Sequence, residues 1–221
     1  MLWFAEEQGE LLAESGRDAM PDNAPKRVLL LLCRGTEILE ASAFLDVMGW
    51  AKDEGSIPVE VVTAALGDRV VACAFGFRLF ADRLLPGLSA SDFDALAIPG
   101  GFEPYGYYDD AYSPAVQGLI RQFGELGKPI ATVCVGALPL AKAGLLSGRR
   151  ATTYHLGEGR RRRQLAELGA VVVDEPVVQD GPFITSSCPA TAVEVALRLL
   201  AAVTGNANAD RICRLMGFED A

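Results

Sequence analysis

One stretch of the chain constrains the fold more than any other, because in it a buried strand runs directly into a helix through a cysteine. The stretch is Ile130–Leu138, with the sequence IATVCVGAL. It begins with the aliphatic residues typical of a central parallel strand. Cys134 follows, and Gly136 stands two places later, where a larger side chain would collide with a crossing chain. This pattern predicts a nucleophile elbow, a sharp turn that lifts a reactive side chain above the sheet.

Strands and helices alternate along the rest of the chain. Short aliphatic runs predict strands at Arg27–Cys33, Val59–Ala64, Ala95–Ile98, Pro129–Val133, Ala151–Thr153, Val171–Val173, Val177–Gln179 and Phe183–Thr185, and a small hairpin or short edge strands within Val70–Phe80. Helical spacing and end signals predict helices at Ile38–Glu54, Ser113–Leu126, Val135–Leu146, Gly159–Leu168, Pro189–Val203 and Asn208–Met216, while Phe102–Tyr112 is expected to be a loop. This alternation predicts a three-layer α/β/α sandwich with a mostly parallel sheet.

Length and charge limit the function classes. The 221 residues suit one domain, which we place at residues 26–221, after an N-terminal extension at residues 1–25. With 20 basic and 29 acidic side chains, the formal charge of −9 argues against general binding of nucleic acids. No stretch approaches the ~20 apolar residues of a membrane span, and the N-terminus lacks the features of a signal peptide. We therefore expect a cytoplasmic protein with no membrane partner.

Cysteine and histidine usage limits the kinds of site. The five cysteines are odd in number and scattered, with no CxxC pair, so free thiols are expected in a reducing compartment. The single histidine, His155, excludes a site built from several histidines. We expect no metal and no organic cofactor.

The elbow indicates how Cys134 could act as a nucleophile. It would place the sulfur at a helix N-terminus, whose dipole favours the thiolate, and would leave the Val135 N–H free to bind an oxyanion. Pro99–Gly100–Gly101 ends another strand, and the Gly101 N–H would complete a hole with two donors. The alternatives are an inert buried cysteine and an ordinary glycine turn, and the spacing by itself leaves them open.

Glu40 brings a carboxyl group to the end of a third strand, after Gly35 and Thr36. It could simply favour the start of the following helix through the helix dipole. If it stays protonated, it could instead donate a hydrogen bond to a thiolate and pass a proton during turnover. The sequence leaves both roles open.

Taken in order, these features resemble the ThiJ/PfpI superfamily, which includes the Parkinsonism-associated deglycase and shares its fold with class I glutamine amidotransferases. The resemblance covers roughly residues 26–205. It rests on the segments RVLLLLCRGTEILE (27–40), FDALAIPGG (93–101), IATVCVGA (130–137), RATT (150–153) and FITSSCPATAVEVAL (183–197).

The resemblance implies a flavodoxin-like sandwich, usually dimeric, that acts on a small-molecule substrate. Cys134 would be the nucleophile and Glu40 its acid partner, with the N–H groups of Gly101 and Val135 as the oxyanion hole. The reaction implied is that of a glyoxalase or deglycase on methylglyoxal-like aldehydes. Hydration or hydrolysis of a C–N compound, as by isocyanide hydratases or amidases, is the next enzymatic alternative. A redox sensor or stress-protective protein, and a binding module that shares only the fold, are the non-enzymatic ones.

The chain also departs from its relatives. The protease-like branch has histidine where this chain has Val135, which argues against a Cys–His protease. Many relatives have histidine where Tyr154 stands here, and His155 comes one place later, so its role as a base depends on its orientation. The isocyanide hydratase branch has Asp in place of Glu40 and Thr in place of Val135.

Three further features remain open in the sequence. Tyr105, Tyr107 and Tyr108 could line the pocket or lie on the surface, including at a dimer contact. Cys188 begins a helix and could be a second reactive thiol. The Arg160–Arg163 run is interpreted as a solvated helix face, with anion binding as the alternative.

Overall fold

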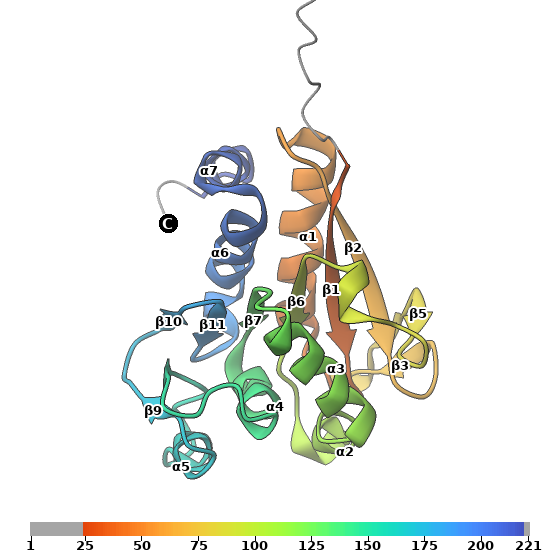
Figure 1. Ribbon diagram of the computed structural model, residues 1–221. Coiled ribbons are helices and arrows are strands. Elements are labelled where there is room, and N and C mark those ends of the chain that lie inside the picture. Colours follow the sequence, from red (N-terminus) through yellow and green to blue (C-terminus); the bar gives the residue numbers. More distant parts are fainter. Residues whose placement is uncertain (1–23, 219–221) are drawn as a thin grey trace, which may run out of the picture.

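Seven strands form one sheet through the middle of the molecule (Figure 1). The computed structural model describes residues 24–218. In spatial order the strands are β10 (Val177–Asp180), β11 (Phe183–Ser186), β7 (Ile130–Thr132), β6 (Ala95–Ile98), β1 (Lys26–Leu32), β2 (Val59–Ala65) and β5 (Arg83–Leu84). β10 runs antiparallel to β11, and the other neighbours pair in parallel. The mostly parallel sheet is confirmed.

Helices cover this sheet. They are α1 (Ile38–Glu54), α2 (Tyr107–Ala111), α3 (Pro114–Glu125), α4 (Ala137–Lys142), α5 (Arg160–Glu167), α6 (Ala192–Thr204) and α7 (Asn206–Leu215). α1, α6 and α7 pack on one another, whereas α3 packs on β6 and α4 (Figure 1). Two small sheets lie beside the main one, β3 (Val70–Ala72) with β4 (Arg78–Phe80), and β8 (Arg150–Ala151) with β9 (Val171–Val172). The three-layer α/β/α, flavodoxin-like fold is confirmed.

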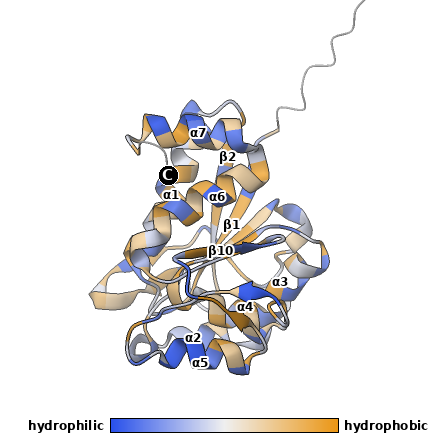
Figure 2. Ribbon diagram, turned by 90° about the vertical axis from the view of Figure 1, so that its left-hand side faces the viewer, coloured by the Kyte–Doolittle hydropathy of each residue, from blue (hydrophilic) through white to orange (hydrophobic). Residues whose placement is uncertain are grey.

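Burial explains why the central strands are so aliphatic. Residues 28–32 of β1 are at most 1% exposed, because helices cover both faces of a parallel sheet. Figure 2 shows hydrophobic colours along β1 and β2 and hydrophilic ones along α5. The arginines of α5 were expected to form a solvated helix face, but the Arg161 side chain is only 15% exposed. At α3, Ser113 accepts a hydrogen bond from the Val116 N–H and Pro114 takes the first position, as their sequence predicts.

Three local predictions were wrong. The helix expected over Val135–Leu146 covers only α4, because a 3-10 turn precedes it and Gly144 adopts a left-handed φ of 89° just after it. The strand expected at Ala151–Thr153 is the two-residue β8, which lies outside the main sheet. The loop expected at Phe102–Tyr112 contains the short helix α2, which the irregular sequence YYDDA does not signal.

The strand order changes direction between β1 and β6. Strands on either side of this point run in parallel, so the segments after their carboxyl ends meet at one edge. The loop after β1 leads to Glu40, Pro99–Gly101 follows β6, and Cys134 follows β7 shortly after its end. The fold therefore brings together the three sequence features that point to chemistry.

The extension predicted at residues 1–25 lies, except for its last two residues, outside the described part of the chain. The boundaries of the single domain at 26–221 remain a prediction. Among the described helices, none has the length and apolar character needed to cross a membrane.

Candidate active site

Cys134 occupies a strained position at the junction of β7 and α4. It begins a 3-10 turn, Cys134–Gly136, and its backbone φ is 55°, a left-handed value that costs a non-glycine residue about 1 kcal/mol or more. A Cβ atom on Gly136 would lie 2.4 Å from the Ile98 carbonyl oxygen. The Thr153 hydroxyl donates a 2.8 Å hydrogen bond to the Cys134 carbonyl and so supports the turn. This is the geometry expected of a nucleophile elbow.

Glu40 lies in the first turn of α1 and is fully buried. Its Oε2 accepts a 2.5 Å hydrogen bond from the Gly100 N–H. Oε1 is buried with no hydrogen-bond partner of ordinary geometry among the described residues. A Cβ atom on Gly100 would lie 2.8 Å from Glu40 Oε2 and 3.0 Å from the Val135 nitrogen. Glycine at this position therefore lets the carboxyl group and the elbow approach each other.

Burial and charge act on both groups. Burial raises the pKa of Glu40 to about 8, and the nearby Glu37 carboxylate raises it as well, against the lowering effect of the Gly100 N–H. Burial also raises the pKa of the Cys134 thiol, and a negative Glu40 raises it further, whereas the Val135 N–H lowers it. The sequence predicted that the helix dipole would lower the pKa of the Cys134 thiol, and burial acts in the opposite direction. At 7% exposure the sulfur lacks water to stabilise its charge, and α4 is too short to have a strong dipole.

The two residues expected to form the oxyanion hole line the same cavity as Cys134. The Val135 N–H faces the Cys134 sulfur closely enough to lower the thiol pKa. Gly101 and Thr36 form an isolated antiparallel bridge, held by the bonds Phe102 N–H to Gly35 O (2.9 Å) and Glu37 N–H to Gly100 O (3.0 Å). Neither of these bonds uses the Gly101 N–H. Both Gly101 and Val135 line one cavity.

This cavity has a volume of about 550 Å³, enough for a small molecule. Cys134 lies in its wall. The other lining residues are Glu37, Gly101, Phe102, Glu103, Pro104, Val135, Tyr154, Leu156, Arg160, Arg161, Cys188, Pro189 and Ala190. The wall is therefore largely apolar, with a few charged groups.

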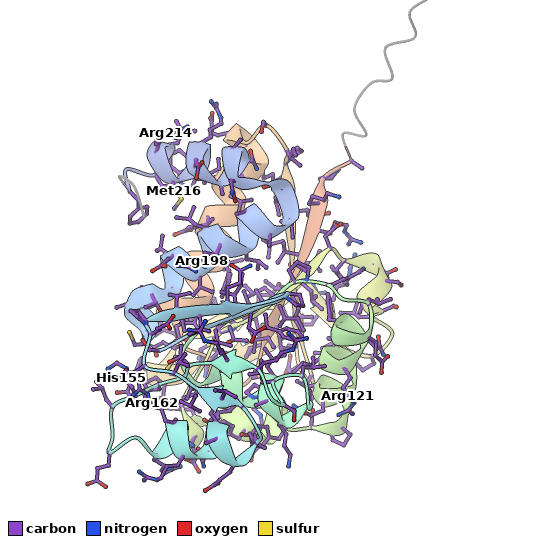
Figure 3. All side chains as sticks on the ribbon, turned by 60° about the vertical axis from the view of Figure 1, so that its left-hand side comes forward. Arg121, His155, Arg162, Arg198, Arg214 and Met216 are labelled. Atoms are coloured by element: carbon purple, nitrogen blue, oxygen red, sulfur yellow. The ribbon has the colours of Figure 1, made fainter. Side chains whose placement is uncertain are left out.

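Tyr154 and His155 were both candidate site residues, and the structure separates them. Tyr154 lines the cavity, but His155 is not among the lining residues, and its Nδ1 is buried without a hydrogen-bond partner in residues 24–218. Figure 3 shows His155 on the same side of the molecule as Arg162. Arg162 is the main cause of the lowered pKa of Asp174, and His155 adds a smaller effect. The one-residue offset thus brings the tyrosine, not the histidine, to the cavity.

The tyrosines after β6 do not line the cavity. Tyr107 is fully buried under Gly101 and donates a 2.7 Å hydrogen bond to the Pro99 carbonyl. Tyr108 packs between Tyr107 and the Arg161 guanidinium, and Tyr105 is 45% exposed.

Sequence reasoning missed two features of the cavity. Glu37 is half-exposed, interacts with the Glu40 carboxyl and has a pKa raised mainly by burial. Its position three residues before Glu40, across one helical turn, could have signalled the pair. Glu103 forms ion pairs with Arg160 and Arg161 in the cavity wall. These arginines lie 57 and 58 residues further along the chain, so no local sequence pattern could predict the contact.

Comparisons with known proteins find one family and several similar chains. The model of the DJ-1/PfpI family matches residues 26–202. Protein dj-1beta of Drosophila melanogaster is 30% identical over 190 residues, which cover 86% of this chain and 95% of that protein. Its crystal structure matches with a TM-score of 0.76 and 30% identity, over 87% of this chain and 98% of that one.

Two further relatives differ in how much of them is matched. Deglycase PfpI of Pyrococcus furiosus is 33% identical over 138 residues, 62% of this chain and 77% of that protein. Protein DJ-1 homolog A of Arabidopsis thaliana is 30% identical over 192 residues, 86% of this chain but 46% of that protein. The match therefore spans about half the length of the plant relative.

Proposed function

Because the chain belongs to the DJ-1/PfpI family, we propose that it is a cysteine-dependent enzyme acting on a small electrophilic carbonyl compound, as glyoxalases and deglycases do. One observation carries the proposal. Cys134 lies in the wall of a cavity at the carboxyl edge of the sheet, beside a buried carboxyl group with a raised pKa and beside the N–H groups of Gly101 and Val135. These groups would serve as the nucleophile, the acid and the oxyanion donors of the proposed reaction.

The proposed working state of the site holds one proton on the Cys134–Glu40 pair. Two interacting groups titrate as a pair, and burial raises the pKa of both Glu40 and Cys134. We propose that the remaining proton stays on Glu40, whose carboxyl donates it in a hydrogen bond to the thiolate. The Val135 N–H favours this arrangement, because it stabilises charge on sulfur.

An α-oxoaldehyde such as methylglyoxal illustrates the proposed reaction. The Cys134 thiolate attacks the aldehyde carbon, a C–S bond forms, and the carbonyl π electrons move to oxygen between the Gly101 and Val135 N–H groups. Glu40 then protonates this oxyanion to give a hemithioacetal. The resulting Glu40 carboxylate removes the proton from the former aldehyde carbon, which gives an enediol, and returns it to the neighbouring carbon. The hydroxyl proton on the first oxygen passes to the oxygen of that neighbouring carbon, so that the first carbon becomes the thioester carbonyl. Water cleaves the thioester that results, which gives a hydroxy acid and restores the thiol.

The test is turnover of methylglyoxal to lactate by the full chain. Cys134→Ser is expected to abolish turnover, and Glu40→Gln to reduce it strongly, since removal of one catalytic group typically costs orders of magnitude in rate. Cys73→Ser is a matched control, because Cys73 is buried elsewhere and does not line the cavity. Full turnover by Cys134→Ser would contradict the proposal. Screening an isocyanide and a primary amide in parallel tests the C–N alternative.

We also propose that the protein works as a homodimer. Phe75, Phe77 and Phe80 on the β3–β4 hairpin are 57–61% exposed, an unusual concentration of aromatic surface. Phe75 packs edge-on against Phe102, which lines the cavity, with ring centroids 4.9 Å apart. A second copy covering this patch would also border the site. Light scattering is expected to give a dimer mass for the native chain and a monomer mass for Phe77→Asp. A native monomer would contradict this assembly.

A further inference from the structure

A second cysteine opens into the cavity that holds Cys134. Cys188 follows β11, is partly exposed and lines this cavity. The other cysteines lie elsewhere: Cys33 is fully enclosed, and the thiols of Cys73 and Cys213 contact the carbonyls of Val71 and Phe218. All five cysteines are within the described residues, so Cys188 is the one thiol that shares the cavity with Cys134.

Strand register brings the two cysteines close together. β11 pairs in parallel with β7, with Ile184 opposite Ala131. Beyond this ladder β7 ends at Thr132 and leads into the turn that begins with Cys134, while β11 ends at Ser186 and leads to Cys188. The two segments stay adjacent beyond the ladder, since the Ser186 hydroxyl lies 3.4 Å from the Thr132 carbonyl oxygen. Neighbouring strands are about 4.8 Å apart, and a disulfide needs Cα atoms about 4.4–6.8 Å apart. Cys134 and Cys188 therefore follow adjacent strands and line one cavity, a placement that a disulfide between them requires.

We propose that Cys188 is a resolving thiol that traps an oxidised Cys134 as an intramolecular disulfide. This inference rests on the proposed reactivity of Cys134. The oxidant is a peroxide. The Cys134 thiolate attacks one peroxide oxygen, an S–O bond forms, the O–O bond breaks, and the departing hydroxide takes a proton to become water. Sulfur loses two electrons and becomes a sulfenic acid, and the peroxide is reduced.

The second step forms the disulfide. The Cys188 sulfur attacks the sulfenic sulfur, an S–S bond forms, and the S–O bond breaks. The hydroxyl group leaves with the Cys188 proton as a second water molecule. A disulfide is reversible, whereas further oxidation of the sulfenic acid to sulfinic or sulfonic acid is not reversed by thiols. Cys188 would therefore protect the site from irreversible loss and make the cavity a dithiol redox site.

The test uses the full chain, limiting hydrogen peroxide and peptide mass spectrometry without reduction. The native chain is expected to lose two hydrogen atoms and to give a cross-linked Cys134–Cys188 peptide, which dithiothreitol reverses. Cys188→Ser is expected to lose the cross-link and to accumulate sulfinic acid on Cys134. Cys73→Ser is the matched control and should form the cross-link as the native chain does. Phenylarsine oxide, which bridges two nearby thiols, gives a second readout on the native chain and should label both cysteines at once.

The outcomes separate this inference from the proposed function. Sulfinic acid on Cys134 of the native chain, with Cys188 still a free thiol, would overturn the resolving role but leave Cys134 a reactive nucleophile. A Cys134 that resists both peroxide and iodoacetamide would overturn the resolving role and the proposed function together.

Discussion

Replacing Glu40 with glutamine should make the protein more stable at neutral and alkaline pH. Glu40 is fully buried, and its pKa is raised from 4.5 to about 8, mainly by burial. Between these two values the folded chain keeps a proton that the unfolded chain loses. Stability is therefore highest below about pH 4.5 with respect to this group and falls as the pH rises through about 8.

The size of the effect follows from the difference in pKa. Each pKa unit of difference corresponds to about 1.4 kcal/mol, so taking the first proton from the buried Cys134–Glu40 pair costs the fold about 5 kcal/mol. Glutamine at position 40 keeps an acceptor for the Gly100 N–H and carries no charge. The variant should lose this pH dependence and gain most of that free energy above about pH 8.

Urea denaturation of the native chain and the variant, at several values between about pH 5 and pH 8, measures this difference. The free energy of unfolding of the native chain should fall relative to that of Glu40→Gln by up to about 1.4 kcal/mol per pH unit. The difference between the two proteins removes the contribution of every group that they share. Parallel curves would refute the reasoning, because they would mean that Glu40 is ionised in the fold at little cost.

Three further substitutions test the surroundings of the pair. Glu37→Gln removes a charge that raises the Glu40 pKa, so in the same denaturation series the variant's stability should fall less with pH and level off at a lower pH than that of the native chain. Gly136→Ala places a Cβ atom 2.4 Å from the Ile98 carbonyl oxygen. It should lower the free energy of unfolding by about 1–3 kcal/mol and slow alkylation of Cys134. If neither value changed, the elbow would not be crowded at this position. Thr153→Val removes the hydrogen bond to the Cys134 carbonyl and should cost about 1–3 kcal/mol of stability by leaving that carbonyl buried and unpaired; calorimetry would detect the lower unfolding temperature.

The sequence predicted best what depends on local patterns. The helix at Ile38–Glu54 and the strand at Ala95–Ile98 have the predicted bounds, because uninterrupted apolar spacing and glycine or proline boundaries define them. The strand–cysteine–glycine pattern likewise predicted the elbow. These features need only neighbouring residues for their explanation.

The rest depended on contacts between distant segments. Threonines 152 and 153 read as a strand, yet their hydrogen bonds go to the Thr185 hydroxyl and to the Cys134 carbonyl, which support the site instead of extending the sheet. The burial of Glu40 is likewise set by the glycines that end β6, and burial is what raises the pKa of both members of the pair. Local sequence patterns predicted that the helix dipole would lower the Cys134 pKa, but they could not show the burial that raises it.

The most direct test of the account is the rate of Cys134 alkylation by iodoacetamide against pH, in the native chain and in Glu40→Gln, with peptide mass spectrometry resolving the five cysteines. If the proton stays on Glu40, the native thiol should become reactive at a lower pH than the thiol of Glu40→Gln, which lacks the acid partner. If Glu40 ionises first instead, its charge suppresses the thiolate. Glu40→Gln would then react at lower pH than the native chain, and that result would contradict the proposed Cys134–Glu40 pair.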